Sequence, residues 1–376
     1  MDYNLLENKF LNIIAYDVPF PPNYGGVIDI YYKVKALASL GIRINLHCFV
    51  NRNKAYSDEL YDICENVYYY KRENGFSYFS SLPHIVNSRR SENLIFNLLQ
   101  NDHPILFEGI HTCYYLSAPE LKNRKKMVRI QDVEPEYYYN LYKNASGLFH
   151  KQYFYMESIR LRKYEKILHY ADTLITLNIK DQEYYKKLFP EKEIINLAPF
   201  SAHSTVDIKE GMGSYALFHS NLTEADNKSA AIFLLKEVVK DTKVPFIIAG
   251  KDPDSELKHL CKERKVKILA NPSDEKLDEL IRNAQVNILV SFMPCGSKIK
   301  IYPALYHGRH CLVNSNMVRG SSFADVCHVS DSEDVLRNDL LQLMQQPFTK
   351  EEIQRREEVF GEISSEKKAE ILSRLF

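Results

Sequence analysis

Short apolar segments of strand length recur along this chain with helical stretches between them. The first series of strand candidates covers residues 11–16, 42–50, 67–70, 105–107, 127–130 and 173–177. The segment 42–50 alternates with period two, as a strand does, and Gly41 just before it suits the end of a helix. Strands that alternate with helices predict a parallel sheet covered on both faces.

The alternation starts again after a polar stretch at 201–213. Its strand candidates are 215–219, 245–249, 266–269, 286–291 and 311–314, and helices are expected over 255–264 and 274–284. A chain of 376 residues is long enough for two domains of roughly 150–200 residues each. We therefore expect an α/β protein of two doubly wound, Rossmann-like domains, over residues 1–205 and 206–349. Ligands of such sheets bind at the carboxyl ends of the strands, so we expect the site in a cleft that these ends face.

The net charge bears on which partners are expected, and the cysteine pattern bears on the cellular compartment. Lys+Arg and Asp+Glu balance at 49 each, so nothing in the net charge favours nucleic acid. The seven cysteines are scattered without a Cys-x-x-Cys pair, which is typical of a reduced compartment. A polar start and the lack of an apolar stretch of roughly 20 residues argue against a signal peptide and a membrane span. The expected location is cytoplasmic.

One helix leaves a second location open. Arg160, Arg162, Lys163 and Lys166 share it with the aromatic residues Tyr153 and Phe154. An ordinary exposed face explains this pattern best, and the alternative is contact with an anionic membrane. A protein peripheral to the inner membrane is therefore compatible with the sequence.

Two loops carry features of a phosphate site. The loop 17–26 follows the first strand and ends in Gly25-Gly26, which lets the backbone approach a ligand at a helix N-terminus; the alternative is a simple Pro/Gly turn. In the segment 295–300, Gly296 and Ser297 offer amides, and Lys298 or Lys300 adds a positive charge. That combination suits a pyrophosphate, with a solvated basic turn as the equal alternative.

Polar side chains also follow two expected strands of the first domain. Gln131 and Glu134 come after strand 127–130, and Glu108 and His111 after strand 105–107. At this edge they suit hydrogen bonding to a sugar, although a single His is more often structural than catalytic. His and Cys show no zinc-type spacing, and neither an Asp-x-Asp motif after a strand nor Gly-x-Ser-x-Gly occurs. We therefore expect no metal.

Taken together, the motifs resemble retaining GT-B glycosyltransferases of the family 4 kind, including bacterial mannosyl- and surface-polysaccharide glycosyltransferases. The resemblance runs through most of the chain in order. It is carried by Asn-Tyr-Gly-Gly-Val-Ile-Asp-Ile-Tyr-Tyr (23–32), Leu-Phe-Glu-Gly-Ile-His-Thr (106–112), Val-Arg-Ile-Gln-Asp-Val-Glu (128–134), Asn-Leu-Thr (221–223), Ile-Ala-Gly-Lys-Asp-Pro (248–253), Gly-Ser-Lys-Ile-Lys (296–300) and Ala-Leu-Tyr-His-Gly-Arg (304–309).

The resemblance implies a nucleotide-sugar donor bound by the second domain and an oligosaccharide or lipid-linked acceptor facing the first. The residues implied for the diphosphate are Gly25, Gly26, Gly296, Ser297 and Lys298, and those implied for the base are Gly250 and Lys251, near Asn271-Pro272. No metal or cofactor is implied, because basic side chains and helix dipoles neutralise the leaving diphosphate. The resemblance also implies that a final helix, 350–376, crosses back to the first domain.

The chain departs from the family pattern at several positions, including Asp132, where Asn is common, and 219–221, where a glycine and a basic residue are common. Gln131 stands where a His commonly contacts the transferred sugar, and Cys295 and Pro303 stand where two glutamates are common. The leading hypothesis is a retaining hexosyltransferase with altered donor contacts. The alternative is a GT-B-shaped pseudoenzyme that binds a nucleotide sugar or glycan without transfer. A GT-B epimerase or phosphorylase has no support in the motifs.

Overall fold

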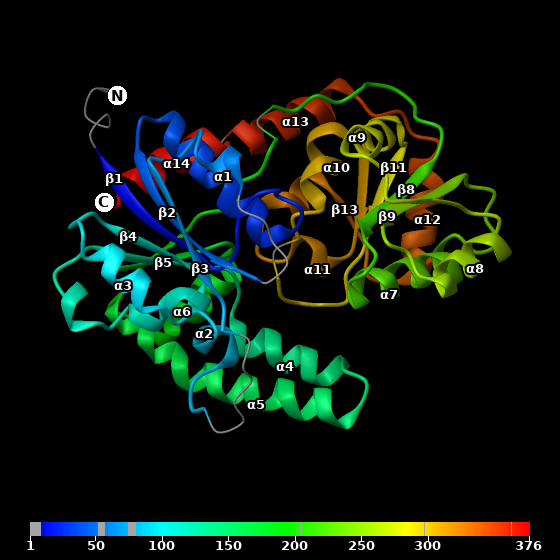
Figure 1. Cartoon of the computed structure of the whole chain (residues 1–376). Coiled ribbons are helices and arrows are strands. Elements are labelled where there is room, and N and C mark those ends of the chain that lie inside the picture. The colour runs from blue at the N-terminus through cyan, green and yellow to red at the C-terminus, as the bar shows by residue number, and fades with distance from the viewer. Residues whose placement is uncertain (1–8, 52–56, 74–79, 204, 297, 362) are drawn as a thin grey trace. The chain divides into compact units, whose positions relative to one another are not determined.

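The structure is a computed structural model that describes residues 9–51, 57–73, 80–203, 205–296, 298–361 and 363–376. Its contacts divide the chain into two compact units (Figure 1). The first unit comprises Met1–Ala202, Cys295–Ser297 and Ser364–Phe376, and the second comprises His203–Pro294 and Lys298–Ile363.

The first unit is built on a parallel sheet of seven strands among its described residues. In hydrogen-bonded order they are β3 (Asn66–Lys71), β2 (Arg43–Val50), β1 (Phe10–Ala15), β4 (Ile105–Glu108), β5 (Lys126–Ile130), β6 (Thr173–Thr176) and β7 (Glu193–Asn196). Its helices are α1 (Gly25–Ser39), α2 (His84–Asn87), α3 (Glu92–Leu98), α4 (Glu134–Asn144), α5 (Leu148–Tyr164), α6 (Ile179–Leu188) and α14 (Ser365–Ser373), with 3₁₀ turns at Asp58–Leu60, Ile110–Tyr115, Pro119–Leu121 and Glu165–Tyr170.

Helices cover both faces of this sheet, as the alternation in the sequence predicts. Ile30 and Val34 of α1 and Leu372 of α14 belong to one buried cluster with β1 and β2. Leu94 of α3 and Tyr185 of α6 belong to another, with β4 and β5. The two clusters leave the strands buried from both sides, which is why they read as nearly continuous apolar runs.

The second unit repeats the plan with a parallel sheet of six strands in its described part. In order they are β10 (Lys267–Ala270), β9 (Phe246–Lys251), β8 (Ala216–Asn221), β11 (Val286–Leu289), β12 (His310–Val313) and β13 (His328–Val329). Its helices are α7 (Ala225–Phe233), which continues as a π-helical turn Leu234–Val238, α8 (Ser255–Glu263), α9 (Asp274–Asn283), α10 (Ile301–His307), α11 (Ser315–Val318), α12 (Glu333–Leu343) and α13 (Lys350–Gly361), with a 3₁₀ turn at Ser322–Val326.

The two doubly wound sheets confirm the predicted fold class, and every strand expected from the sequence is present. Two strands were not expected, β7 and β13, because both are short strands at sheet edges. The single helix expected over 350–376 is two helices. Ser364 caps α14 by accepting a hydrogen bond from the Lys367 amide, which starts a new helix at that point. Contacts place α13 in the second unit and α14 in the first.

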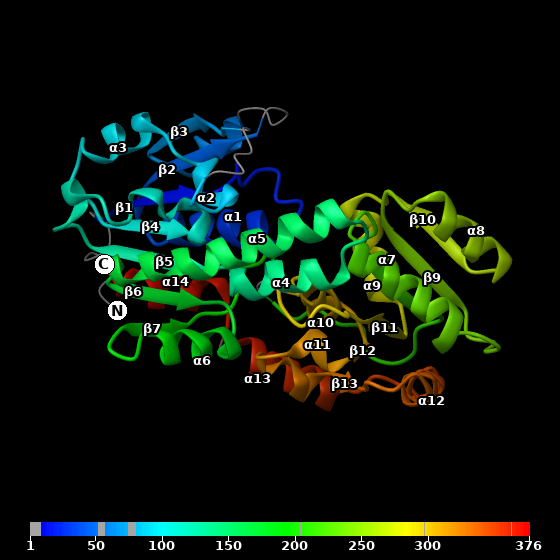
Figure 2. The same cartoon turned by 90° about the horizontal axis from the view of Figure 1, so that it is seen from below.

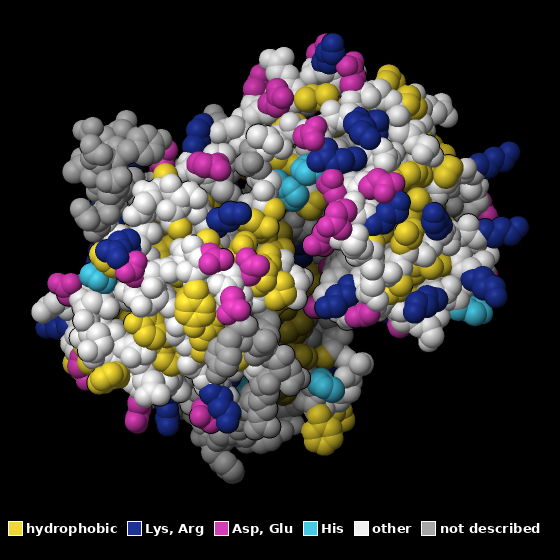
Figure 3. Space-filling view, turned by 45° about the horizontal axis from the view of Figure 1, so that its top comes forward, with side chains coloured by type: hydrophobic (Ala, Val, Ile, Leu, Met, Phe, Trp, Pro, Cys, Tyr) yellow, Lys and Arg dark blue, Asp and Glu magenta, His cyan; other side chains and the backbone are white. Residues whose placement is uncertain are grey.

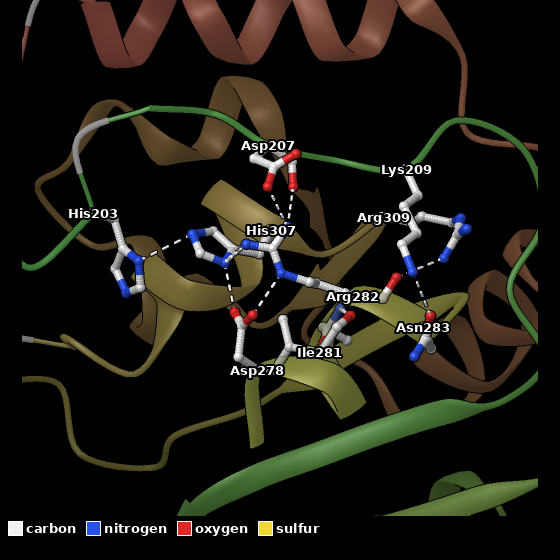
Figure 4. Close-up of polar contacts among 10 residues, drawn as sticks. His203, Asp207, Lys209, Asp278, Ile281, Arg282, Asn283, His307 and Arg309 are labelled. Carbon is white, nitrogen blue, oxygen red and sulfur yellow. Dashed lines mark hydrogen bonds and ion pairs between the residues drawn. The ribbon is translucent and has the colours of Figure 1, made fainter. Parts of the chain in front are cut away.

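The segment that opens the second unit is held by a chain of polar contacts (Figure 4). Arg282 of α9 donates to the Asp207 carboxylate (2.6 Å) and to Asp278 (2.5 Å). His307 at the end of α10 contacts Asp278 through Nδ1 (2.5 Å) and His203 through Nε2 (3.1 Å). These contacts tie His203 and Asp207 to α9 and α10 of the same unit.

The surface carries charges of both signs. On the face shown in Figure 3, Lys and Arg side chains are interspersed with Asp and Glu, as the balanced composition leads one to expect. Among the described residues, the helices are too short or too polar to cross a bilayer.

A fully buried group of charges lies between α1 and the sheet of the first unit. Arg129 of β5 donates two hydrogen bonds to Asp29 of α1, both 2.8 Å long. Lys33, one helical turn further on, lies 3.0 Å from Asp29 and 2.8 Å from Glu108 of β4. The Phe200 amide also donates to Asp29 (2.8 Å). Burial alone would raise the pKa of Asp29, but the Arg129 and Lys33 charges and these hydrogen bonds hold it well below its usual range.

We predict that Asp29→Asn destabilises the first unit by about 3–5 kcal/mol, because it leaves buried Arg129 and Lys33 without their shared counter-charge. The measurement is the urea midpoint and the melting temperature of the full chain. Asp102→Asn is the matched control, since the Asp102 side chain is fully exposed. Equal midpoints for the two variants would show that the buried charges do not depend on Asp29.

Candidate functional site

The candidate sites lie at the topological switch point of each sheet. In the first unit, β1 lies between β2 and β4, so the chain leaves β1 towards β2 and later returns to its other side. In the second unit, β8 holds the same position between β9 and β11. Loops diverge at such points and leave a crevice beyond the carboxyl ends of the strands.

The glycine pair of the first loop opens α1. The helix begins at Gly25, and the Tyr24 side chain does not cap it. A Cβ on Gly26 would lie 1.6 Å from the Tyr16 hydroxyl oxygen, so only glycine fits there. The Tyr24 hydroxyl instead donates to Asp17 across the loop (2.6 Å). Gly26 therefore has a packing role, whereas the amides of the first turn of α1 remain oriented as an anion site requires.

His111 and Glu134 come together at the ends of β4 and β5. His111 Nε2 lies 3.8 Å from Glu134 Oε1, and the His111 ring stacks on Tyr16 at 5.0 Å. Gly109 makes room for the ring: its φ is +69°, and a Cβ there would lie 2.7 Å from His111 Nδ1. Buried Arg89 joins this group, stacking over Tyr16 at 5.9 Å and donating to the Tyr16 carbonyl oxygen (2.8 Å). No motif in the sequence marks Arg89, which follows the short helix α2 and not a strand.

Burial makes His111 and Glu134 an uncharged pair. It raises the pKa of Glu134 well above its usual value, with the Asp132 charge adding to the rise. It lowers the pKa of His111 well below the usual value, with the positive charges of Arg89 and Arg72 adding to the fall. Their 3.8 Å contact is therefore between a carboxylic acid and a neutral ring. A buried neutral acid at a strand end is able to donate a hydrogen bond to a sugar oxygen.

Gln131 and Glu108 lie beside this pair. The Gln131 amide nitrogen donates to Glu108 Oε2 (3.2 Å), while Lys33 pairs with the other carboxylate oxygen (2.8 Å). The Glu108 side chain is completely buried, so it positions Gln131 and belongs to the buried charge group. Gln131 itself is partly exposed at the edge of the sheet.

The segment Cys295–Ser297 belongs to the first unit, although it comes from the middle of the second unit's sequence. Gly296 has a φ of +85°, a conformation that favours glycine, and its amide donates to Asp132 Oδ1 (2.6 Å). The Asn140 side chain lies 3.7 Å from the Cys295 sulfur. Ser297 lies outside the described residues. The Gly296 amide thus has a carboxylate acceptor in this structure.

In the second unit, Gly250 and Lys251 end β9. A Cβ on Gly250 would lie 2.0 Å from the Ser220 carbonyl oxygen of β8, so glycine allows the strands to pair here. The Lys251 side chain is exposed. Beyond it, Asn271 and Asp252 exchange hydrogen bonds of 2.8 and 2.9 Å. This reciprocal pair fixes the ends of β9 and β10 near the positions expected for a base.

Lys300 lies at the switch point of the second unit. Its ammonium donates to the Asn227 side chain of α7 (2.6 Å) and to the Val290 carbonyl oxygen after β11 (3.3 Å). Burial, opposed by the Asp226 charge and aided by the Lys298 charge, lowers the pKa of Lys300 to about 8. Lys298 is partly exposed two residues earlier. Of the two lysines that the sequence offered, the structure holds Lys300 against the end of the sheet.

Comparisons with known proteins identify the fold. No protein-family model matches the sequence. The "Uncharacterized 44.6 kDa protein in cps region" of Klebsiella pneumoniae is 24% identical over 313 residues, which cover 78% of this chain and 79% of that protein. Sucrose-phosphate synthase from Thermosynechococcus elongatus matches with a TM-score of 0.69 at 13% identity, over 98% of both chains.

TarM matches with the same TM-score, 0.69, at 11% identity, over 100% of this chain and 99% of TarM. A crystal structure of S. aureus TarM holds Fondaparinux, alpha-GlcNAc-glycerol and UDP. These neighbours are GT-B glycosyltransferases, and the chain has their GT-B fold.

The raised pKa of Glu134 predicts how the stability of the protein changes with pH. Folded Glu134 keeps a proton that the unfolded chain releases above about pH 4.3, so this group's contribution to stability is full below that pH and falls as the pH rises. Glu134→Gln, which is always neutral, should therefore gain melting temperature relative to the wild type between about pH 5 and about pH 8.

The measurement is the difference in melting temperature between variant and wild type at the two pH values. Glu136→Gln measures the effect of removing an exposed carboxylate from the same helix. A difference for Glu134→Gln that does not change with pH would contradict a protonated Glu134.

Proposed function

We propose that this chain is a retaining hexosyltransferase that moves a sugar from a nucleotide-sugar donor to an oligosaccharide or lipid-linked acceptor in cell-surface glycan synthesis. The GT-B fold, which it shares with sucrose-phosphate synthase and TarM, supports a transferase. The similarity to a protein in a cps (capsule polysaccharide) region supports a role in glycan synthesis. The TarM complex makes UDP the first nucleotide to test.

The observation that carries the proposal is the placement of Lys300. In sugar transfer without a metal, the hard event is departure of the diphosphate from an oxocarbenium-like sugar, and groups that stabilise the new negative charge contribute most. Lys300 is mostly buried at the switch point, held by an amide and a carbonyl oxygen rather than by a carboxylate. An ammonium in that setting retains much of its attraction for a diphosphate. Lys298 supplies a second charge nearby.

The first unit would supply the acceptor side and the sugar contacts. Glu134 as a neutral acid and Gln131 as a positioned amide offer hydrogen bonds at the strand ends. Arg89 adds a buried positive charge behind His111 and Tyr16. Gly25 and Gly26 open α1, whose first amides suit an oxygen of the donor diphosphate. No cofactor takes part in this proposal, and the nucleotide sugar is a substrate.

The alternative function is binding of a nucleotide sugar without transfer. One contact favours it: the Gln131 amide is already engaged by Glu108 (3.2 Å). A thermal-shift screen against UDP, GDP, ADP, CMP and dTDP would identify the nucleotide. Release of free nucleoside diphosphate from the matching nucleotide sugar, with a panel of acceptors, then separates the two functions. Tight binding without release above background would establish the pseudoenzyme.

The lowered pKa of Lys300 predicts a pH dependence of binding. Because the ligand binds the charged ammonium, affinity for the nucleoside diphosphate is full well below the pKa of about 8 and falls as the pH rises through it. The groups around this ammonium are Asp226, Lys298 and buried His219. Calorimetry at about pH 8 should show proton uptake on binding, since a nearby anion raises the pKa of an amine.

Lys300→Arg keeps the charge without titrating, so it should bind with little pH dependence over the same range. Lys300→Ala should lose about 1–3 kcal/mol of binding free energy, the scale of a charged hydrogen bond, and Lys298→Ala tests the second lysine in the same way. Unchanged affinity in Lys300→Ala would remove this residue from the donor site.

The exposed apolar residues of the helical hairpin α4–α5 support the proposal that the acceptor is linked to a membrane lipid. The two helices pack against each other (Figure 2), and the start of α5, next to the turn between them, presents Leu148 and Phe149, each with 85% of its surface exposed. Lys143 lies beside this turn, over the Tyr139 ring at 4.7 Å. Exposed apolar side chains flanked by cations suit the interface of an anionic bilayer. Arg160, by contrast, pairs with buried Glu157 (2.7 Å) and is not part of this surface.

We predict that the double variant Leu148→Ser/Phe149→Ser loses binding to vesicles that contain anionic lipid. Each side chain contributes on the order of 1.5–3 kcal/mol when fully buried, so the loss should exceed tenfold in co-sedimentation. The matched control is Phe96→Ser/Leu99→Ser, which removes two exposed apolar side chains at α3. Equal binding by both double variants would contradict a membrane role for the hairpin.

A further inference from the structure

A mixed group of histidine and carboxylate side chains lies at the opposite edge of the second sheet from Lys300. His310 is the first residue of β12, His328 is the first residue of β13, and Glu352 lies in the first turn of α13. One ligand atom from each lies within 4.8 Å of the other two, which marks them as a candidate metal group among the described residues. The three residues are far apart in sequence, so no Cys/His spacing announces them.

Two of the three distances between the ligand atoms are close to those of a tetrahedral metal site. His310 Nδ1 lies 3.3 Å from His328 Nε2 and 3.6 Å from Glu352 Oε1. Ligands about 2.0–2.2 Å from a tetrahedral zinc ion lie roughly 3.3–3.5 Å from one another. Two imidazoles and a carboxylate with one open position form a common zinc ligand set.

Hydrogen bonds from outside the group already orient the ligand atoms. His310 Nε2 contacts the Gln346 carbonyl oxygen (2.9 Å). Because a carbonyl can only accept, the proton is on Nε2, and a neutral ring then directs the lone pair of Nδ1 towards His328. Glu352 Oε2 accepts from the Thr349 amide (2.8 Å), which leaves Oε1 facing His310. Metal-ligating histidines and carboxylates in proteins are held by such outer contacts.

Burial favours the ligating form of both rings. His310 is fully buried, and the Phe348 ring lies edge-on to it at 5.0 Å. Such surroundings favour an uncharged ring, whose lone pair is then available to a metal ion. The positive charge of Arg356 also favours neutral rings, but it opposes the binding of a cation. The Arg356 guanidinium donates to the carbonyl oxygens of Leu305, Gly308 and Arg309, and these contacts partly offset its charge.

We propose that His310, His328 and Glu352 bind one transition-metal dication of the Zn²⁺ class. The ion would join β12, the two-residue edge strand β13 and the start of α13. These elements meet at the amino-terminal edge of the sheet, whereas Lys300 lies at the carboxyl edge. The proposed ion site therefore lies away from the lysine that we assign to sugar transfer.

The test uses the full untagged chain, stripped with a chelator and then titrated with Zn²⁺ or Co²⁺. We expect one ion per chain, a higher melting temperature with metal, and a Co²⁺ absorption spectrum of low coordination number. Glu352→Gln is the main variant, because Gln preserves the hydrogen bonding of a capping box with Thr349 while removing the anionic ligand. It should weaken metal binding at least tenfold, as should His328→Gln.

His259→Gln is the control, since His259 is an exposed histidine of α8 in the same unit. It should bind metal as the wild type does. The proposal is overturned if the stripped wild type takes up less than a stoichiometric amount of Zn²⁺ and Co²⁺, or if Glu352→Gln and the wild type bind them equally. If His328→Gln fails to fold, the comparison between Glu352→Gln and His259→Gln decides.

Discussion

The pairing of Asp29 with Arg129 is the contact on which the first unit depends most. Asp29 lies on α1 and Arg129 on β5, two strands away from β1, so this ion pair fixes the helix across the middle of the sheet. Lys33 extends it to Glu108 on β4, and Lys368 of α14 donates to the Pro199 carbonyl oxygen (2.5 Å) beside the same group. Because isolated buried charges are costly, each of these elements is tied to one arrangement. The ends of β4 and β5, which carry the candidate site, are positioned by it.

The sequence predicted the parts that local pattern controls. Apolar runs gave the strands, and Gly41 ended α1 with a φ of +82° as expected. Contacts between distant segments could not be predicted in this way. The sequence Gly25-Gly26 suggested a loop that binds phosphate. In the structure, a side chain at position 26 is excluded by the Tyr16 hydroxyl, which the sequence pattern does not reveal. His310, His328 and Glu352 meet only because β12, β13 and α13 start at the same edge.

In both candidate sites, burial disfavours the charged form of an ionisable side chain. In the first unit it keeps Glu134 protonated, and in the second it brings the pKa of Lys300 to about 8. Among the described residues, neither group forms a direct ion pair with a charged partner: Lys300 donates to an amide and a carbonyl oxygen, whereas Asp29 accepts from Arg129, Lys33 and a backbone amide. A buried ionisable group without such partners lowers stability, so its presence at the carboxyl edge of a sheet is more characteristic of a binding site than of a core.

The departures from the glycosyltransferase pattern have different physical consequences. Pro303 is the third residue of α10, where a backbone N–H has no partner within the helix, so proline costs no helical hydrogen bond. What it removes is a carboxylate that would bind a donor ribose, which affects affinity and not the reacting bond. Gln131 replaces a ring that could titrate, but its amide is fixed by Glu108, and Glu108 is fixed by Lys33. A hydrogen-bonding group held that firmly still favours one sugar orientation. In the proposed function, leaving-group stabilisation depends on Lys298 and Lys300 and not on these positions, so we infer that the substitutions reduce the rate or alter donor choice more readily than they abolish transfer.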